Sequence, residues 1–292
     1  MGQKKLAMIL ASCFLLASCV APGDQQGSEH NESLPVINRQ EYSHVRAVLD
    51  ARKQIAETPL DKYVHSEDEL TQIAAANFFN LKKCVNGKGY EVFHHFYQTK
   101  ILPEMPLGVW SEESASKNGT RVVEELGKIY IDEGVDNDSP AVLKAHTECQ
   151  QEIMSSEIPG LRLGLDVSSS SAEATVLGET YNQAQVLLAS DPEVQSAIHE
   201  WERCLKKEGV VFDEFYKTPV APEEPEANIR QALLDVQCKT NVKLMEIYFN
   251  AQAQYEQALI EKNQAVFNRL ATLKQEQLDE ARKILRENGV TP

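Results

Sequence analysis

The chain has 292 residues, of which 44 are Asp or Glu and 29 are Lys or Arg, so its formal net charge at pH 7 is −15. A charge this negative repels the phosphates of nucleic acids and anionic lipid headgroups, which argues against a nucleic-acid partner and against electrostatic attachment to a membrane. The length allows one large domain or two small ones.

The N-terminal segment has the pattern of an export signal. Lys4 and Lys5 are followed by about 13 uncharged, mostly apolar residues, which suits a secretory signal and is too short for a membrane span of about 20 residues. The segment ends in Leu16-Ala17-Ser18-Cys19, which resembles the lipobox of bacterial lipoproteins, where the cysteine takes a diacylglycerol and becomes the new N-terminus. We therefore expect a signal peptide over residues 1–18 and lipidation of Cys19.

Two other interpretations of this segment stay open. Leu10-Ala11-Ser12-Cys13 has the same form, but cleavage there would leave an apolar core of only about seven residues, the lower limit for a secretory signal. An ordinary signal peptide with an incidental cysteine is the other interpretation. Removal of residues 1–18 takes away two lysines and no acid, so the net charge becomes −17. Because so negative a charge does not favour electrostatic binding to anionic lipids, we expect the acyl chains to hold the protein at the membrane.

Residues 19–38 are expected to form a disordered tether. They are rich in Gly, Ser, Gln, Asn and acidic side chains, a composition that buries too little apolar surface to fold. A helix is expected next, at about 40–56.

Two capped helices are indicated further along the chain. Ser66 and Glu69 form a capping box, and an apolar stripe follows, made of Leu70, Ile73, Ala74, Phe78 and Leu81. We expect this helix to end at Gly87 or Gly89. A helix at 172–189 precedes the second, which is capped by Asp191 with Pro192 in its first turn. Its stripe is Val194, Ile198, Trp201 and Leu205, and Gly209 ends it.

An internal repeat relates two stretches of the chain. Residues 78–89 match 198–209 with an offset of 120, and after a one-residue slip 96–106 match 215–225. The shared positions include a cysteine, a glycine, a Phe-Tyr pair and a Pro-Glu-x-Pro motif. We therefore expect two related helical units, 39–170 and 171–292, joined by the linker Ser168–Ser171.

The four cysteines beyond the N-terminal segment are Cys84, Cys149, Cys204 and Cys238. An even number in an exported chain predicts disulfides, and the lack of a CxxC pair gives zinc binding or thioredoxin-like chemistry little support. Four cysteines allow three pairings. Because each copy of the repeat holds two, the duplication favours Cys84–Cys149 and Cys204–Cys238. Each closed loop would contribute on the order of 4 kcal/mol.

From Ala227 to Asn288 the chain contains neither Gly nor Pro. An unbroken helix of this length would run about 90 Å, far beyond the diameter of a compact domain. It either projects as an arm or folds back as a helical hairpin, and Lys262-Asn263 is the best break because Asn can cap the second segment. Strand signals are confined to Ile129–Ile131 and Val210–Phe212. The predicted fold is therefore mainly α: two related helical units, each cross-linked by a disulfide, ending in a long helix or helical hairpin.

Candidate chemical groups are few. His94 and His95 are adjacent, point in different directions and lack carboxylates at metal-ligand spacing, so a solvated loop is the preferred interpretation. His65, His146 and His199 are isolated, and we expect each on a helix surface. The acidic runs Asp132-Glu133 and Glu223-Glu224 are interpreted as solvated loops or helix starts.

Aromatic side chains are expected mostly in the core. Trp201 and Leu81 occupy matching positions of the repeat and are assigned to the core; Trp110, Phe96 and Phe215 are either buried or exposed platforms for carbohydrate. No Gly-x-Ser-x-Gly elbow or phosphate loop occurs. The sequence therefore predicts no catalytic residue, metal site or cofactor.

Several motifs together resemble a group of uncharacterised lipoproteins from actinobacteria. They are Pro59–Tyr63, Asp191–Val194, Trp201–Leu205, Gly209, Val236–Lys239 and the long C-terminal helix with Gln254-Tyr255. In that group a methionine commonly follows the helix cysteine, whereas this chain has Val85 and Leu205. The resemblance covers most of the chain from about residue 55. It implies a secreted Gram-positive envelope protein at the extracytoplasmic face of the cell membrane, with no established activity.

The leading functional expectation is a non-enzymatic binding or scaffold module of the cell envelope, with an envelope protein, a transporter or a cell-wall polymer as partner. A ligand-carrying lipoprotein associated with an ABC-type transporter is the first alternative, although most such carriers have alternating strands that this chain lacks. A cell-wall enzyme is the second alternative.

Overall fold

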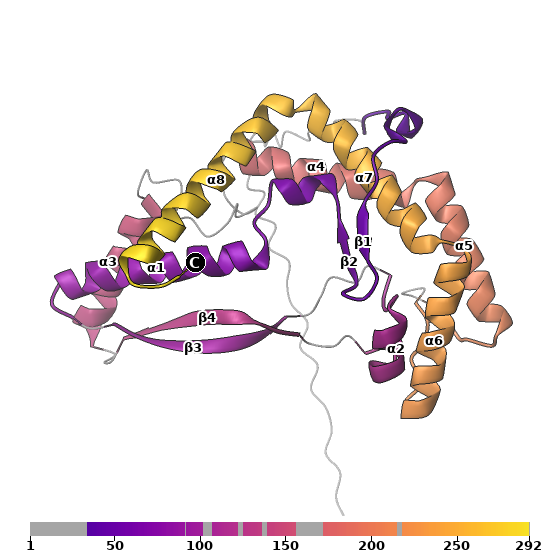
Figure 1. Ribbon diagram of the computed structural model, residues 1–292, viewed down its shortest axis with the longest axis horizontal. Coiled ribbons are helices and arrows are strands. Elements are labelled where there is room, and N and C mark those ends of the chain that lie inside the picture. The colour runs from indigo at the N-terminus through magenta and orange to yellow at the C-terminus, as the bar shows by residue number, and fades with distance from the viewer. Residues whose placement is uncertain are drawn as a thin grey trace, which may run out of the picture. The chain divides into compact units, whose positions relative to one another are not determined.

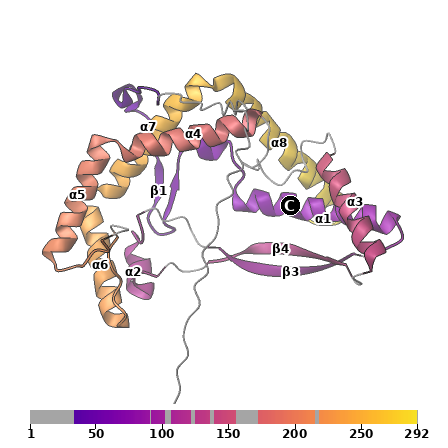
Figure 2. The same ribbon diagram turned by 180° about the vertical axis from the view of Figure 1, so that it is seen from behind.

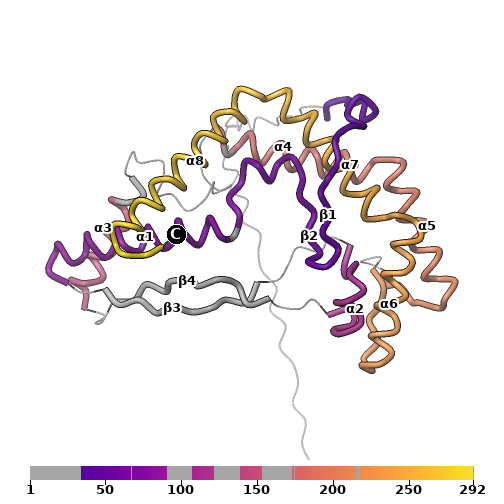
Figure 3. Tube along the Cα trace, in the orientation of Figure 1, coloured from indigo at the N-terminus to yellow at the C-terminus, as the bar shows by residue number. Residues whose placement is uncertain are grey.

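The computed structural model covers the whole chain and describes residues 34–90, 92–101, 107–121, 125–135, 139–155, 172–214 and 218–291. Figure 3 traces the path of the backbone. The chain divides into two units, Met1–Leu34 and Pro35–Pro292. The predicted signal peptide, Cys13, Cys19, most of the predicted tether and the linker Ser168–Ser171 lie outside the described residues.

The described part is mainly helical, as predicted, and contains eight α-helices (Figure 1). They are α1 (Glu67–Gly87), α2 (Glu112–Asn118), α3 (Pro140–Ser155), α4 (Ala172–Ala189), α5 (Pro192–Lys207), α6 (Pro225–Asn241), α7 (Leu244–Lys262) and α8 (Gln264–Glu287). The short 3-10 helices are η1 (Arg39–Tyr42) and η2 (Pro59–Lys62). Two separate two-stranded antiparallel sheets pair β1 (Val48–Asp50) with β2 (Ile55–Glu57) and β3 (Val92–Ile101) with β4 (Glu125–Val135).

The prediction of a helix at about 40–56 is wrong, because this segment forms η1 and the β1–β2 hairpin. Gln54 adopts the left-handed conformation with φ 57° in the turn between the strands, which a right-handed helix does not allow. Leu49 and Ala56 pack against the core cluster around Trp110. Side chains alternate between the two faces of a strand, so a half-buried hairpin needs an apolar residue only at every second position. Contact of these residues with Trp110, which is distant in the sequence, favours the hairpin over a helix.

The start signals of α1 and α5 are confirmed. The Ser66 hydroxyl accepts from the backbone N–H of Glu69, and the Glu69 carboxylate accepts from that of Ser66. At α5 the Asp191 carboxylate accepts from the N–H groups of residues 193 and 194. Each helix is followed by a glycine at positive φ, Gly89 at 85° and Gly209 at 82°. Local chemistry therefore sets the ends of both helices.

The strands depart from the sequence expectations at several points. Ile129–Ile131 does lie in a strand, β4, but Val210–Phe212 contributes only an isolated bridge between Phe212 and Pro219. His94-His95 lies in β3 and Asp132-Glu133 in β4, so placing these residues in loops is wrong. The register of the β3–β4 sheet pairs His94 with Glu133 and His95 with Asp132. A long two-stranded ribbon depends on a partner about 35 residues away, which single-strand patterns do not reveal.

The C-terminal stretch is divided into three helices, so the expectation of one unbroken helix is wrong and the helical hairpin is not confirmed. The break at Asn263 is present, but the Asn263 side chain does not cap α8; its amide donates to the Leu259 carbonyl at 3.4 Å. A further break lies at Val242-Lys243. Helix α7 packs against α4 and α5, while α8 packs against α1 (Figures 1 and 2). Helices α7 and α8 therefore pack mainly against other helices and only slightly against each other.

Hydrophobic clusters include residues from both predicted helical units. One cluster joins Ile73 and Ala76 of α1 to Ala281 and Leu285 of α8. Another places Trp110 beside Met245 and Phe249 of α7, and a third joins Leu60 to Leu177, Ile260, Phe267 and Leu270. Residues 35–292 consequently form one compact unit.

Candidate functional site

Both predicted disulfides are present. Cys84 of α1 is bonded to Cys149 of α3, and Cys204 of α5 to Cys238 of α6, with Cα atoms 5.8 Å apart in each pair. In each pair the first cysteine is half-buried in the last turn of its helix and the second is fully buried. Cys149 lies inside α3, whereas Cys238 lies in the last turn of α6 because that helix ends at Asn241.

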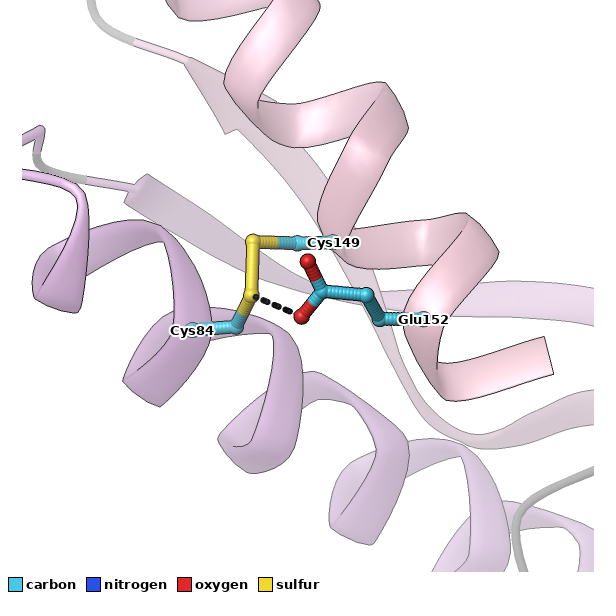
Figure 4. Close-up of side chains that lie close together, drawn as sticks. All are labelled: Cys84, Cys149 and Glu152. Carbon is cyan, nitrogen blue, oxygen red and sulfur yellow. Dashed lines mark hydrogen bonds between the residues drawn. A yellow bond between two sulfur atoms is a disulfide. The ribbon is translucent and has the colours of Figure 1, made fainter. Parts of the chain in front are cut away.

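Charged side chains surround the Cys84–Cys149 disulfide. Figure 4 shows Glu152 of α3 turned toward it, with a carboxylate oxygen 3.5 Å from the Sγ of Cys84. A disulfide sulfur has no proton to donate, so this is a close approach of a charged oxygen to sulfur. The Lys88 ammonium donates to Glu148 at 3.1 Å and to Glu152 at 3.2 Å. These hydrogen bonds raise the pKa of Lys88, and the bond from Lys88 lowers the pKa of Glu148.

Cys84, Cys149 and Glu152 also have the spacing of metal ligands. One ligand atom from each lies within 4.8 Å of the others, and no further group of three His, Cys, Asp or Glu in the described part of the chain meets this spacing. In the disulfide the two sulfurs are bonded to each other and are not thiolates, the form that binds metal. The three side chains are therefore placed as metal ligands, but the disulfide form of the two cysteines does not bind a metal ion.

The second disulfide adjoins a buried charged network. The Lys239 ammonium, 1% exposed, donates to the Asp235 carboxylate at 2.6 Å and to the Val109 carbonyl at 2.7 Å. The Trp201 indole N–H donates to the other Asp235 oxygen at 2.7 Å. Burial lowers the pKa of Lys239 and raises that of Asp235, against the attraction between the two. The network joins α5, α6 and the segment before α2.

Sequence reasoning missed this network. Asp235 and Lys239 are four residues apart on one helix, a spacing typical of exposed ion pairs on helix surfaces. Nothing near them in the sequence shows that Trp201 and the Val109 carbonyl cover them. The one indication of burial in the sequence was that Lys239 directly follows Cys238, a cysteine predicted to form a disulfide.

Buried acidic groups attach the N-terminal part of the folded unit to α7. The Glu256 carboxylate accepts from the backbone N–H of Leu60 in η2 at 3.1 Å, and burial raises its pKa. Asp191 accepts from the Tyr255 hydroxyl at 2.8 Å and pairs with Arg39 of η1 at 3.2 Å. Burial, aided by the Asp191 carboxylate, raises the pKa of Tyr255 to about 12. These titratable groups are engaged in holding elements together.

The isolated histidines differ from one another. His199 is exposed on α5, as predicted. The prediction for His65 is wrong: it is buried, with Nε2 2.7 Å from the Gln277 side-chain oxygen of α8 and Nδ1 3.9 Å from Glu69. His146 is half-buried on α3, where burial lowers its pKa. Packing of α8 over the start of α1 explains the burial of His65.

Most aromatic side chains whose burial is described lie in the hydrophobic clusters or pack against them. Trp201 and Leu81 are buried, as predicted. Trp110 is also buried, with its ring centroid 6.2 Å from that of Phe249, so it is no exposed platform for carbohydrate. Phe96 lies in β3, and Phe215 lies outside the described residues.

Comparison with protein-family models, curated proteins and solved structures finds no match. Among the helices that the structure describes, none is both long and apolar enough to cross a membrane.

Proposed function

We propose that this chain is a lipid-anchored protein of the cell envelope, cleaved before Cys19 and attached through that cysteine at the extracytoplasmic face of the membrane. Its folded unit would act as a non-enzymatic scaffold that binds an envelope partner. The observation that carries the proposal is the pair of disulfides in a chain that begins with a lipobox-like segment. Disulfides form and persist in oxidising, extracytoplasmic compartments.

The buried ionisable groups support a scaffold in preference to an enzyme. Lys239 and Asp235 bind each other and neighbouring groups, Glu256 holds η2, and Asp191 holds Tyr255 and caps α5. A catalytic group needs a shifted pKa together with access to substrate. The side chains of Lys239, Asp235, Glu256 and Asp191 are all buried, and each is bonded to other groups of the fold.

Metabolic labelling with an alkyne fatty acid tests the anchor. We expect label on the wild-type protein and on Cys13→Ala, and none on Cys19→Ala. Label that survives in Cys19→Ala and disappears in Cys13→Ala would place cleavage at the earlier site. An unlabelled wild-type protein made in a lipoprotein-processing host would refute the lipid anchor.

Site-specific photo-crosslinking in intact cells tests the scaffold. A photoreactive amino acid replaces Val48 of β1 or Val211 in the segment between α5 and α6, aliphatic side chains that are 65% and 67% exposed. Lys283, a half-exposed lysine of α8, is the control position. We expect a discrete adduct with one envelope protein or wall polymer from at least one valine position and a different pattern from Lys283. Only diffuse adducts at all positions would contradict a specific partner, and capture of an ABC-type transporter subunit would favour the ligand carrier.

A further inference from the structure

We propose that reduction of the Cys84–Cys149 disulfide creates a binding site for a soft divalent metal ion, such as Zn²⁺, with Cys84, Cys149 and Glu152 as ligands. The inference concerns the folded unit alone, so it holds or fails independently of the lipid anchor.

The spacing of the ligand atoms carries the argument. Tetrahedral zinc with bonds of about 2.3 Å to sulfur and 2.1 Å to oxygen places a sulfur and an oxygen ligand about 3.6 Å apart. The Sγ of Cys84 and a Glu152 oxygen are already 3.5 Å apart, and all three ligand atoms lie within 4.8 Å of one another. Once the S–S bond is broken, the two sulfurs need only separate to about 3.8 Å to take their places.

The charges of the site suit a dication. Two thiolates and the Glu152 carboxylate carry three negative charges, and Zn²⁺ together with the Lys88 ammonium supplies three positive ones. Lys88 already contacts Glu152, the carboxylate ligand of the proposed site. With Glu152 63% exposed, an ion can enter from solvent, and a water molecule can complete the four ligands.

The other disulfide lacks each of these features. In its unit Asn241 stands three residues after the buried cysteine where the first unit has Glu152, and Gln237 replaces Glu148. Glu208 takes the place of Lys88. The same cross-link therefore occurs twice in the chain, but among the described residues a carboxylate lies at ligand distance from the sulfurs only at the first.

The chemistry balances with a dithiol as reductant. A dithiol of the thioredoxin type gives up two electrons and two protons and becomes a disulfide; the Cys84–Cys149 bond breaks and its sulfurs take up both protons. The metal ion then displaces these two protons, which pass to solvent, and binds the two thiolates. The disulfide and the metal-bound form are thus two alternative states of one site.

Metal competition on the purified chain tests the proposal. The protein is reduced without oxygen by a thiol-free phosphine and titrated with Zn²⁺ against a chromophoric chelator. We expect one tightly bound equivalent in the reduced protein and none in the disulfide form. Substitution Glu152→Gln should weaken binding by about tenfold or more, since even outer partners of metal ligands typically contribute that much. The matched control, Cys204→Ser with Cys238→Ser, should keep the site.

Equal affinity of the reduced wild type and of Cys84→Ser with Cys149→Ser would overturn the proposal, as would an unchanged affinity in Glu152→Gln. Because a variant can fail to fold, protection of the cysteine thiols from alkylation is also measured in the reduced wild-type protein. With Zn²⁺ present, alkylation followed by peptide mass analysis should find Cys84 and Cys149 protected and Cys204 and Cys238 modified. Full modification of Cys84 and Cys149, or equal protection of all four cysteines, would also overturn it.

Discussion

Gly119 ends α2 with φ 65° and ψ −137°, a backbone conformation that side chains rarely adopt. A Cβ added there would lie 1.9 Å from the Oδ1 of Asn228, an atom that accepts from the Thr120 N–H at 2.8 Å. Gly119→Ala should therefore lower the free energy of unfolding by about 2–4 kcal/mol. The matched control is Gly87→Ala at the end of α1, where a Cβ meets nothing within 4 Å. It should raise stability by up to about 1 kcal/mol. Urea unfolding measures both, and equal effects would refute this account of Gly119.

The Asp235–Lys239 pair is buried, so its partners depend on each other. Lys239→Ala leaves the Asp235 carboxylate buried without its cation and should cost about 3–5 kcal/mol. Adding Asp235→Ala should lose less than the sum of the two single variants. Lys283→Ala, which removes an exposed pair with Glu280, should change stability by less than about 1 kcal/mol. Strictly additive effects of the buried pair, measured by urea unfolding, would argue against this coupling.

Glu256 should make stability depend on pH. Its pKa in the folded protein is raised above the ordinary 4.5 by burial, so folding favours its protonated form. The stabilisation is complete below pH 4.5 and is lost as the pH rises through the folded-state pKa. Glu256→Gln keeps an oxygen for the Leu60 N–H and removes the charge. We expect the variant to be more stable than the wild type at pH 7, with the difference shrinking toward pH 4.5.

Glu246→Gln, an exposed substitution on the same helix, is the control for the loss of one negative charge. Thermal unfolding across pH 4–8 is the measurement. A Glu256→Gln variant that is less stable than the wild type throughout this range would contradict the role of burial.

At the scale of elements, the break between α6 and α7 lies at Lys243, an exposed residue in the left-handed region with φ 54°. Glycine adopts this conformation without the steric cost that a side chain brings. Lys243→Gly should therefore leave stability unchanged or raise it by up to about 1 kcal/mol. The same substitution inside α8, Lys283→Gly, should cost about 1 kcal/mol. Circular dichroism during thermal unfolding compares the two, and a larger loss at Lys243 would show that its side chain stabilises the junction.

Elements with local start and stop signals were predictable. Ser66 with Glu69 and Asp191 with Val194 define helix starts through hydrogen bonds that span three residues. The β1–β2 hairpin and the break at Lys243 have no such signal. The hairpin depends on contact with Trp110, and the break occurs where no Gly or Pro marks it.

At the scale of the whole molecule, the two disulfides close chain segments of 65 and 34 residues. In the chain-entropy model the stabilisation depends on the logarithm of loop length, so each contributes about 4 kcal/mol and the two differ by less than about 1 kcal/mol. Urea unfolding of Cys84→Ser with Cys149→Ser, and of Cys204→Ser with Cys238→Ser, measures each cost. A cost several-fold larger for one pair would show that native packing outweighs the entropy of the unfolded chain.

The sequence by itself determined the helical class, the caps of α1 and α5 and both disulfide pairings, because each depends on neighbouring residues or on a repeat visible along the chain. Tertiary structure alone decided that Lys239 is buried against Val109, that His65 lies under α8, and that Glu152 faces the first disulfide. These contacts join residues up to 212 positions apart. The free energy of such a contact depends on packing that removes water from both partners, and no local sequence pattern indicates which residues will be buried in this way.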